Sequence, residues 1–162
     1  MKSARIVRRR GDFPLSGESL TGILRAVLAK GKPLRFRARG LSMSPFIKDG
    51  DVVTVAPLEE SPPRTGDVVA FLHPATGQAA LHRVVRAGSG SYSLKGDNSS
   101  ETDGALPPER ILGLVTRVER EGRRVRLGSR GGAVIAKLSR SGALARAVDA
   151  ARRAGLRKKR TP

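Results

Sequence analysis

A serine lies in a stretch bounded by glycine and proline, GLSMSPFIKDGD at residues 40–51. The hydroxyl of Ser42 is a poor nucleophile until a base takes its proton, so a serine enzyme needs a neutral histidine or lysine beside it. The chain has two histidines, and His73 precedes a proline in a predicted turn. His82 lies in a strand pattern with apolar neighbours, where partial desolvation favours the neutral form. His82 is therefore the better candidate base, although a lone strand histidine is more often a semi-buried structural side chain.

An acidic turn follows in the stretch LKGDNSSETD, at residues 94–103. It contains Asp97, Glu101 and Asp103 beside an asparagine and several hydroxyls. One interpretation is a solvated β-turn in which Asp97 and Asn98 hydrogen-bond their own backbone. The other is that a carboxylate here orients an imidazole and stabilises its cation, as in a Ser-His-Asp site. Spacing along the chain does not decide between these two interpretations.

The residues before Ser42 predict one helix and one strand. Residues 19–30 place leucine, isoleucine and valine at helical spacing, with a serine at the start and Gly31 at the end. This pattern is typical of an amphipathic helix that packs on the domain or against a partner. Residues 34–39, LRFRAR, alternate apolar and basic side chains, which indicates a half-exposed strand that leads to Gly40.

Short strand patterns separated by proline and glycine clusters fill most of the remaining chain. They cover residues 51–58, 66–72, 80–87, 91–96, 111–120 and 123–128, and residues 104–108 are predicted to form a turn. We therefore expect a mainly β fold of the barrel or sandwich kind, with one helix before it and another after it. The expected organisation is a basic flexible arm at 1–15, an amphipathic helix at 16–33, a β domain at 34–128 and a basic helical tail at 129–162.

The composition limits which other chemistry the chain can perform. At 162 residues it is long enough for one domain with a single core. The absence of cysteine excludes disulfides, iron–sulfur clusters and thiolate zinc sites, and two histidines build little of a metal site, so no cofactor is expected. No long uninterrupted apolar window occurs, and no small-residue cleavage site follows the first apolar stretch. Neither a transmembrane helix nor a secretory signal is therefore predicted.

The short motifs occur together in one order, and in that order they resemble the type I signal peptidase family. These motifs are Ser42-Met43-Ser44-Pro45, Gly50-Asp51, Gly66-Asp67-Val68-Val69, His82-Arg83-Val84-Val85, Lys95-Gly96-Asp97-Asn98 and Ile111-Leu112-Gly113. That family belongs to a wider group that includes the LexA-type self-cleaving repressors. The resemblance covers roughly residues 34–128 and implies a LexA-like or signal-peptidase-like β core with serine endopeptidase activity.

The resemblance also implies a role for each catalytic position. Bacterial signal peptidases and LexA-type repressors use a lysine base, whereas the archaeal and endoplasmic-reticulum type has a histidine before Arg-Val. This chain has His82 there, so it resembles the histidine branch. The implied roles are Ser42 as nucleophile, His82 as general base and Asp103 as the acid that orients it. Asp103 stands six residues after Asp97, which matches the family interval, and Asp97 itself is expected to support the site.

Several neighbouring residues complete the expected site. Lys95, which precedes Gly-Asp-Asn, is interpreted as part of the turn and not as the base. Met43 is expected to contact the core or the substrate channel, and Ser44 belongs to the same supporting set. Many bacterial relatives have a hydroxyl residue two positions before the nucleophile, where this chain has Gly40. The Ser42 backbone amide is the expected oxyanion donor.

The formal charge of +18 indicates an anionic partner, and many of the cations lie in residues 2–10 and 152–160. A peptide or protein substrate is the first expected partner, with peripheral contact to an anionic membrane as a second. The alternative function is a basic nucleic-acid-binding or regulatory protein with a LexA-like core, although residues 1–33 are short for a helix-turn-helix domain. The expected location is cytoplasmic or peripheral to a membrane. Plain solubilising tails would also explain the basic ends.

Overall fold

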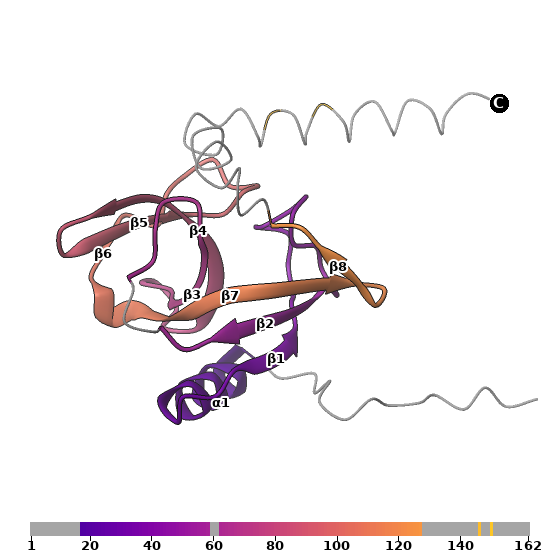
Figure 1. The fold of residues 1–162 in the computed structure, drawn as a ribbon. Coiled ribbons are helices and arrows are strands. Elements are labelled where there is room, and N and C mark those ends of the chain that lie inside the picture. Colours follow the sequence, from indigo (N-terminus) through magenta and orange to yellow (C-terminus); the bar gives the residue numbers. More distant parts are fainter. Residues whose placement is uncertain (1–16, 59–61, 128–145, 147–149, 151–162) are drawn as a thin grey trace, which may run out of the picture.

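A computed structural model describes residues 17–58, 62–127, 146 and 150 of the chain. Those residues form one antiparallel β-sheet and one α-helix, which confirms the predicted mainly β fold. Figure 1 shows the sheet strongly coiled, with the helix against one end of it. The predicted basic arm lies outside the described residues, and so does the predicted helical tail apart from residues 146 and 150.

The helix α1, Gly17–Ala29, buries one face on the sheet. Leu24 and Leu28 are four residues apart, so they lie on the same face, and both are buried. The chain leaves the helix through Gly31, whose φ of 68° is a left-handed conformation that glycine adopts easily. The helix begins two residues earlier than predicted. The serine expected at its start is therefore inside its first turn.

The strands follow the predicted segments closely. They are β1 Leu34–Arg37, β2 Val52–Ala56, β3 Val68–Leu72, β4 Ala79–Gly88, β5 Ser91–Lys95, β6 Ala105–Leu106, β7 Ile111–Arg120 and β8 Arg123–Val125. Their order in the sheet is β1-β2-β7-β3-β4-β5-β6, with β8 paired to β7. The prediction of a turn at 104–108 was wrong in part, because residues 105–106 pair with β5 and a short 3₁₀ helix, Pro108–Arg110, follows. A two-residue strand is too short to produce a recognisable alternation.

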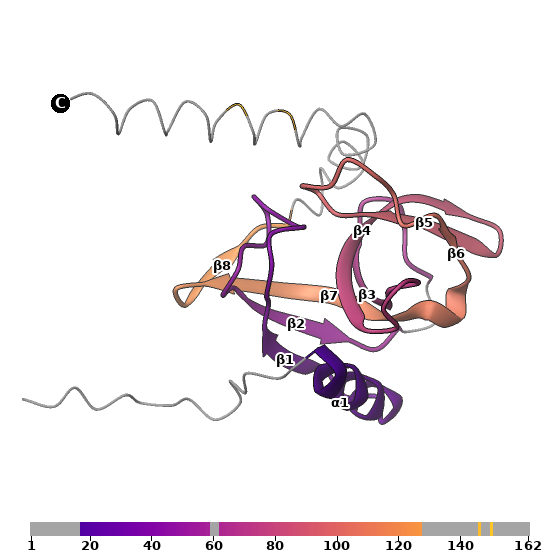
Figure 2. The ribbon, with the colours of Figure 1, turned by 180° about the vertical axis from the view of Figure 1, so that it is seen from behind.

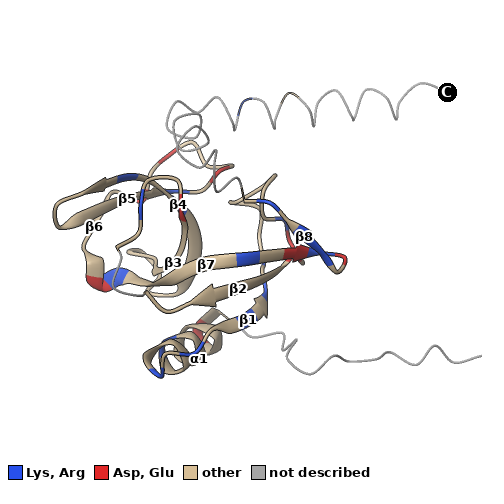
Figure 3. Cartoon of the chain, viewed as in Figure 1, with Lys and Arg blue, Asp and Glu red and all other residues tan. Residues whose placement is uncertain are grey.

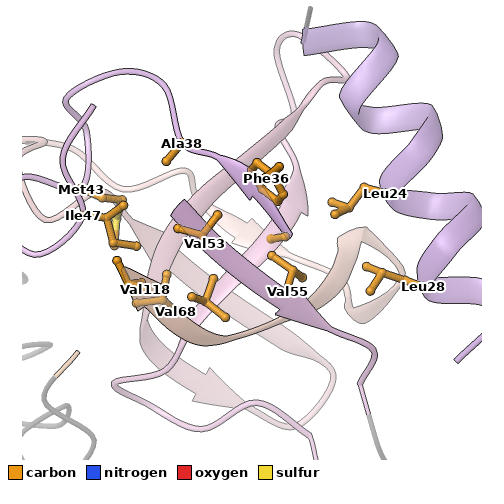
Figure 4. Packing of buried hydrophobic residues seen from close by; sticks show 12 residues of the cluster. Leu24, Leu28, Phe36, Ala38, Met43, Ile47, Val53, Val55, Val68 and Val118 are labelled. Atoms are coloured by element: carbon orange, nitrogen blue, oxygen red, sulfur yellow. The ribbon is translucent and has the colours of Figure 1, made fainter. Parts of the chain in front are cut away.

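Aliphatic side chains hold α1 to the sheet. Figure 4 shows Leu24 and Leu28 pointing toward Phe36 and Val55, which come from β1 and β2. Burying one such side chain contributes about 1.5–3 kcal/mol relative to leaving it in water. In β1 the buried Phe36 is flanked by exposed arginines, so the predicted half-exposed strand is confirmed.

β1 lies at one edge of the sheet, and α1 lies beside it (Figure 2). Within the described residues β1 pairs only with β2, and Figure 2 shows α1 next to β1 from behind. Basic positions are spread over α1, β1 and the β7–β8 hairpin in Figure 3. No helix in the described part of the chain is long and apolar enough to cross a bilayer.

Candidate active site

Ser42 lies in the loop between β1 and β2, and backbone hydrogen bonds close this loop at its base. The Ala38 amide donates to the Asp51 carbonyl at 2.7 Å, and the Gly50 amide donates to the Ala38 carbonyl at 2.9 Å. Gly40 has a φ of 91°, so a residue with a side chain would be strained there. The loop that carries Ser42 is therefore held in place where it leaves β1 and where it enters β2.

An ion pair to β7 fixes the far end of the loop. Asp51 is buried, and both of its carboxylate oxygens accept hydrogen bonds from Arg120, at 2.8 and 2.7 Å. The Lys48 amide also donates to Asp51, at 2.8 Å. Burial alone would raise the pKa of Asp51. The hydrogen bonds from Arg120 and Lys48 together outweigh this effect, so the pKa of Asp51 lies below its ordinary value. The Asp51 carboxylate is thus ionised and paired with Arg120, and this pair holds the Gly-Asp turn in place.

The turn between β5 and β6 holds the middle of the Ser42 loop. The Asn98 amide donates to the Ser42 carbonyl at 2.7 Å, and the Asn98 side-chain amide donates to the Leu41 carbonyl at 3.2 Å. Two of the motifs found in the sequence, which are more than fifty residues apart, are therefore in direct contact. These two bonds hold the backbone on both sides of the serine in place.

A fully buried ion pair fixes this turn in its own place. Arg83 on β4 donates to both carboxylate oxygens of Asp97, at 2.8 and 2.7 Å, and also to the Gly66 carbonyl at 2.8 Å. Both side chains are 0% exposed, and the guanidinium lies 5.3 Å from the centre of the Phe46 ring. Sequence reasoning gave Arg83 no role of its own. The available signal was its place between a candidate base and two valines in a buried strand.

His82 and Asp103 are in direct contact. His82 is on β4 opposite Val69 of β3 and is 8% exposed. Its Nδ1 atom lies 2.5 Å from Asp103 Oδ2, and the Phe71 ring lies against the imidazole with 5.3 Å between centroids. A carboxylate on Nδ1 favours the tautomer that carries its proton there. The Nε2 atom then has its lone pair available to accept a proton.

The second imidazole nitrogen faces the Ser42 loop. A Cβ atom placed on Gly96 would lie 2.7 Å from the Ser42 carbonyl oxygen and 3.1 Å from His82 Nε2. Both atoms therefore converge on one point above Gly96. No real side chain tolerates such contacts, so only glycine at this position lets the serine loop and the imidazole approach each other. The structure thus places His82 against Asp103 and near the Ser42 backbone, and all three residues line one hollow, while no hydrogen bond joins the Ser42 hydroxyl to His82 within the described residues.

Two hollows of different character meet at Ser42. The first, here called the apolar cleft, has a volume of about 310 Å³ and runs between α1, β1 and the start of β4. Its walls include Leu20, Leu24, Phe36, Met43, Ile47 and Leu81. The second, here called the polar hollow, is lined by His73, Pro74, His82 and residues 98–103. Ser42 lines both hollows, so this residue stands at the boundary between them.

The other predicted residues lie around this centre in different environments. Met43 and Ser44 are buried beneath the loop, and the Gly40 amide donates to Asp49 at 2.9 Å. Lys95 is the last residue of β5, as the predicted strand at 91–96 implies, and it is only 2% exposed, so its interpretation as part of the turn was wrong. Burial lowers the pKa of Lys95, while the nearby Asp97 raises it less.

His73, which the sequence placed in a turn, lies in the polar hollow. Its Nε2 atom is 3.5 Å from Asp103 Oδ1, so the two imidazoles approach the two oxygens of one carboxylate. Its Nδ1 atom accepts a hydrogen bond from the Ala75 amide at 3.3 Å. The described residues contain no group of three or more side chains suited to binding a metal ion.

Comparison with known proteins agrees with this arrangement. A search of the curated proteins finds no match to the chain. The model of the family described as Peptidase S24-like matches residues 18–116, which include α1, the Ser42 loop, His82 and Asp103. The match covers more than half of the sequence and the whole of the site described above. The chain therefore belongs to the Peptidase S24-like family.

Proposed function

We propose that the chain is a serine endopeptidase of the signal peptidase type, with Ser42 as nucleophile, His82 as general base and Asp103 as the orienting acid. The observation that carries the proposal is the position of the imidazole, with Nδ1 on Asp103 and Nε2 facing the Ser42 loop. A Ser-His-Asp mechanism requires a carboxylate on Nδ1 and the serine hydroxyl within reach of Nε2, and the first of these two contacts supports the proposal. The histidine before Arg-Val further supports the branch that resembles archaeal and endoplasmic-reticulum signal peptidases.

The proposed reaction has two steps. In the first, the Ser42 oxygen attacks the carbonyl carbon of a bound peptide while His82 Nε2 takes the hydroxyl proton. The carbon–nitrogen bond breaks, and His82 gives that proton to the departing amine. In the second, His82 takes a proton from water and the water oxygen attacks the acyl carbon. The bond between that carbon and the Ser42 oxygen then breaks, and His82 returns the proton to Ser42 as the acid product leaves. Asp103 stabilises the imidazolium in both steps without itself being protonated.

Charge that develops on the carbonyl oxygen needs a hydrogen-bond donor. Within the described residues the Ser42 amide donates no hydrogen bond, so it is available for this role. The Gly40 amide, two residues earlier, is already bonded to Asp49. We therefore assign the Ser42 amide as the oxyanion donor and exclude the Gly40 amide.

The apolar cleft is the proposed binding site of the substrate chain. β1 is an edge strand, and an extended peptide can add to such an edge through backbone hydrogen bonds. The walls of the cleft come from β1, from the beginning of β4 and from Leu20 and Leu24 of α1. A peptide that lies along β1 would therefore place apolar side chains into the cleft and its carbonyl at Ser42.

The test is cleavage by Ser42→Ala and His82→Ala variants of a peptide library with small residues at the cleavage position. Both variants are expected to lose cleavage by about 10³-fold or more, and wild-type protein is expected to label with a serine-reactive fluorophosphonate. Ser89→Ala, in the exposed turn between β4 and β5, is the matched control and should behave as wild type. Unchanged cleavage in Ser42→Ala, or no labelling of the wild type, would refute the proposal.

A further inference from the structure

The two hollows that meet at Ser42 have charged walls of opposite sign. Among the described residues that line the apolar cleft, the only charged ones are Arg37 and Arg39. Of the residues in the described part of the chain that line the polar hollow, Glu101 and Asp103 are the only carboxylates, and none is a lysine or arginine. A peptide bound across Ser42 would therefore meet positive charge at one end and negative charge at the other.

Arg39 is the arginine that is available to a ligand. Its side chain is exposed, and it forms no hydrogen bond or ion pair within the described part of the chain. Arg37 differs, because its guanidinium donates to the Gly50 carbonyl at 2.8 Å and so helps to close the loop. A guanidinium presents several donors in a fixed plane, which suits a carboxylate better than any other group of a peptide.

The position of His82 decides which part of a substrate lies in each hollow. The general base must return its proton to the departing amine nitrogen, so the amine leaves on the side of the imidazole. His82 lines the polar hollow and not the apolar cleft. The part of the substrate before the cleaved bond therefore occupies the apolar cleft, and the part after it occupies the polar hollow.

We propose that Arg39 selects substrates with an acidic residue before the cleaved bond, within the segment that lies along β1. Glu101, which is exposed on the wall of the polar hollow, disfavours an acid and favours a basic residue directly after that bond. The other titratable groups facing the polar hollow are His73, His82 and Asp103, and Asp103 is already engaged by the imidazoles. The substrate class is thus an apolar peptide whose charge changes sign across the cleaved bond.

This inference rests on the proposed endopeptidase function, so its first test separates binding from catalysis. Fluorescent peptides carry alanine before the bond and Glu, Gln or Lys at each of the next two positions toward the N-terminus. Their affinity is measured for the Ser42→Ala protein, which keeps both charged walls. We expect the Glu peptide to bind about three- to fivefold more tightly than the Lys peptide at low salt, with the difference fading in 0.5 M NaCl.

A charge reversal identifies the residue responsible. In the Ser42→Ala background, Arg39→Glu should reverse the preference so that the Lys peptide binds more tightly, and Arg39→Gln should abolish it. Arg86→Glu is the matched control, because Arg86 is exposed, lines neither hollow and changes the net charge equally. Equal effects of Arg39→Glu and Arg86→Glu would assign the preference to the overall positive charge and overturn the inference. So would identical binding of the Glu and Lys peptides.

The same peptides given to protein with Ser42 intact distinguish the two proposals. If the Glu peptide is cleaved with a higher kcat/KM than the Lys peptide, and Arg39→Glu inverts this order, both the peptidase activity and the role of Arg39 are supported. Selective binding without any cleavage refutes the proposed peptidase activity and leaves the assignment of Arg39 in place. For the second wall, a Lys-over-Glu preference after the cleaved bond should invert in Glu101→Lys, and an unchanged preference would refute the role of Glu101.

Discussion

The apolar cleft and the polar hollow adjoin the same serine but are held together by different forces. The cleft is walled by side chains from α1, β1 and β4, whose positions depend on aliphatic packing. The hollow is made mainly from one turn, residues 98–103, which depends on a buried ion pair and on hydrogen bonds to the Ser42 loop. Packing tolerates changes of similar volume, whereas a buried charge requires its partner. The two sides of the site should therefore fail in different ways.

The largest effect on catalysis is expected from the carboxylate that contacts His82 in the polar hollow. Asp103→Asn keeps the size of the side chain but removes the carboxylate that stabilises the His82 cation. We expect kcat for peptide cleavage to fall on the order of 10³-fold, with little change in KM or in the melting temperature. Steady-state kinetics and thermal unfolding measure these quantities. A loss confined to KM would contradict the assigned role.

The next effect concerns the buried ion pair under the polar hollow. Arg83→Met leaves the Asp97 carboxylate buried without its partner, which should lower the free energy of unfolding by about 3–5 kcal/mol. The double variant Arg83→Met/Asp97→Leu removes both charges and should regain most of that stability. Urea unfolding measures the three proteins. If the double variant were as unstable as Arg83→Met, the loss of stability would not come from the unpaired Asp97 charge, and the prediction would be wrong.

A smaller effect is expected where the Ser42 loop joins β2. Because the pKa of Asp51 is lowered in the folded state, its contribution to stability is present above the unfolded value of 3.8 and is lost as pH falls below it. Arg120→Gln should lower the free energy of unfolding by about 2 kcal/mol at pH 7 and by less at pH 3. Arg126→Gln, at an exposed position, is the control. An equal loss at both pH values would contradict the pairing.

The smallest effect is expected on the packed side. Leu20 is only partly buried and lines the apolar cleft from α1. Leu20→Ala should widen the cleft, cost about 1 kcal/mol of stability or less, and improve cleavage of peptides with larger side chains before the bond by a few-fold. Ile23→Ala, on the exposed face of the same helix, should leave this preference unchanged. An unchanged size preference in Leu20→Ala would show that α1 does not bound the substrate site.

Much of the fold could be read from the sequence because its signals are local. The period-two pattern of residues 34–39 predicts β1, and Gly31 marks the end of α1. β6 was missed because two residues carry no period, and its pairing with the preceding strand β5 is visible only in the fold. The burial of Lys95 was missed for a related reason. Sequence patterns predict that a charged residue next to a turn, such as Lys95, is exposed. Its burial depends on which segments pack over it, and only the fold shows these.

Residue type and order suffice to name the candidate groups, which are Ser42, His82 and the carboxylates of residues 97–103. The family resemblance implied Asp103 as the partner of the imidazole, but the contact itself became visible only in the fold, since Asp97 and Asp103 both lie on the same short turn. Asp97 turns inward to Arg83, and Asp103 turns to His82. The structure also decided that two hollows of opposite charge share one serine. That arrangement depends on contacts between strands far apart in the chain, which no local pattern encodes.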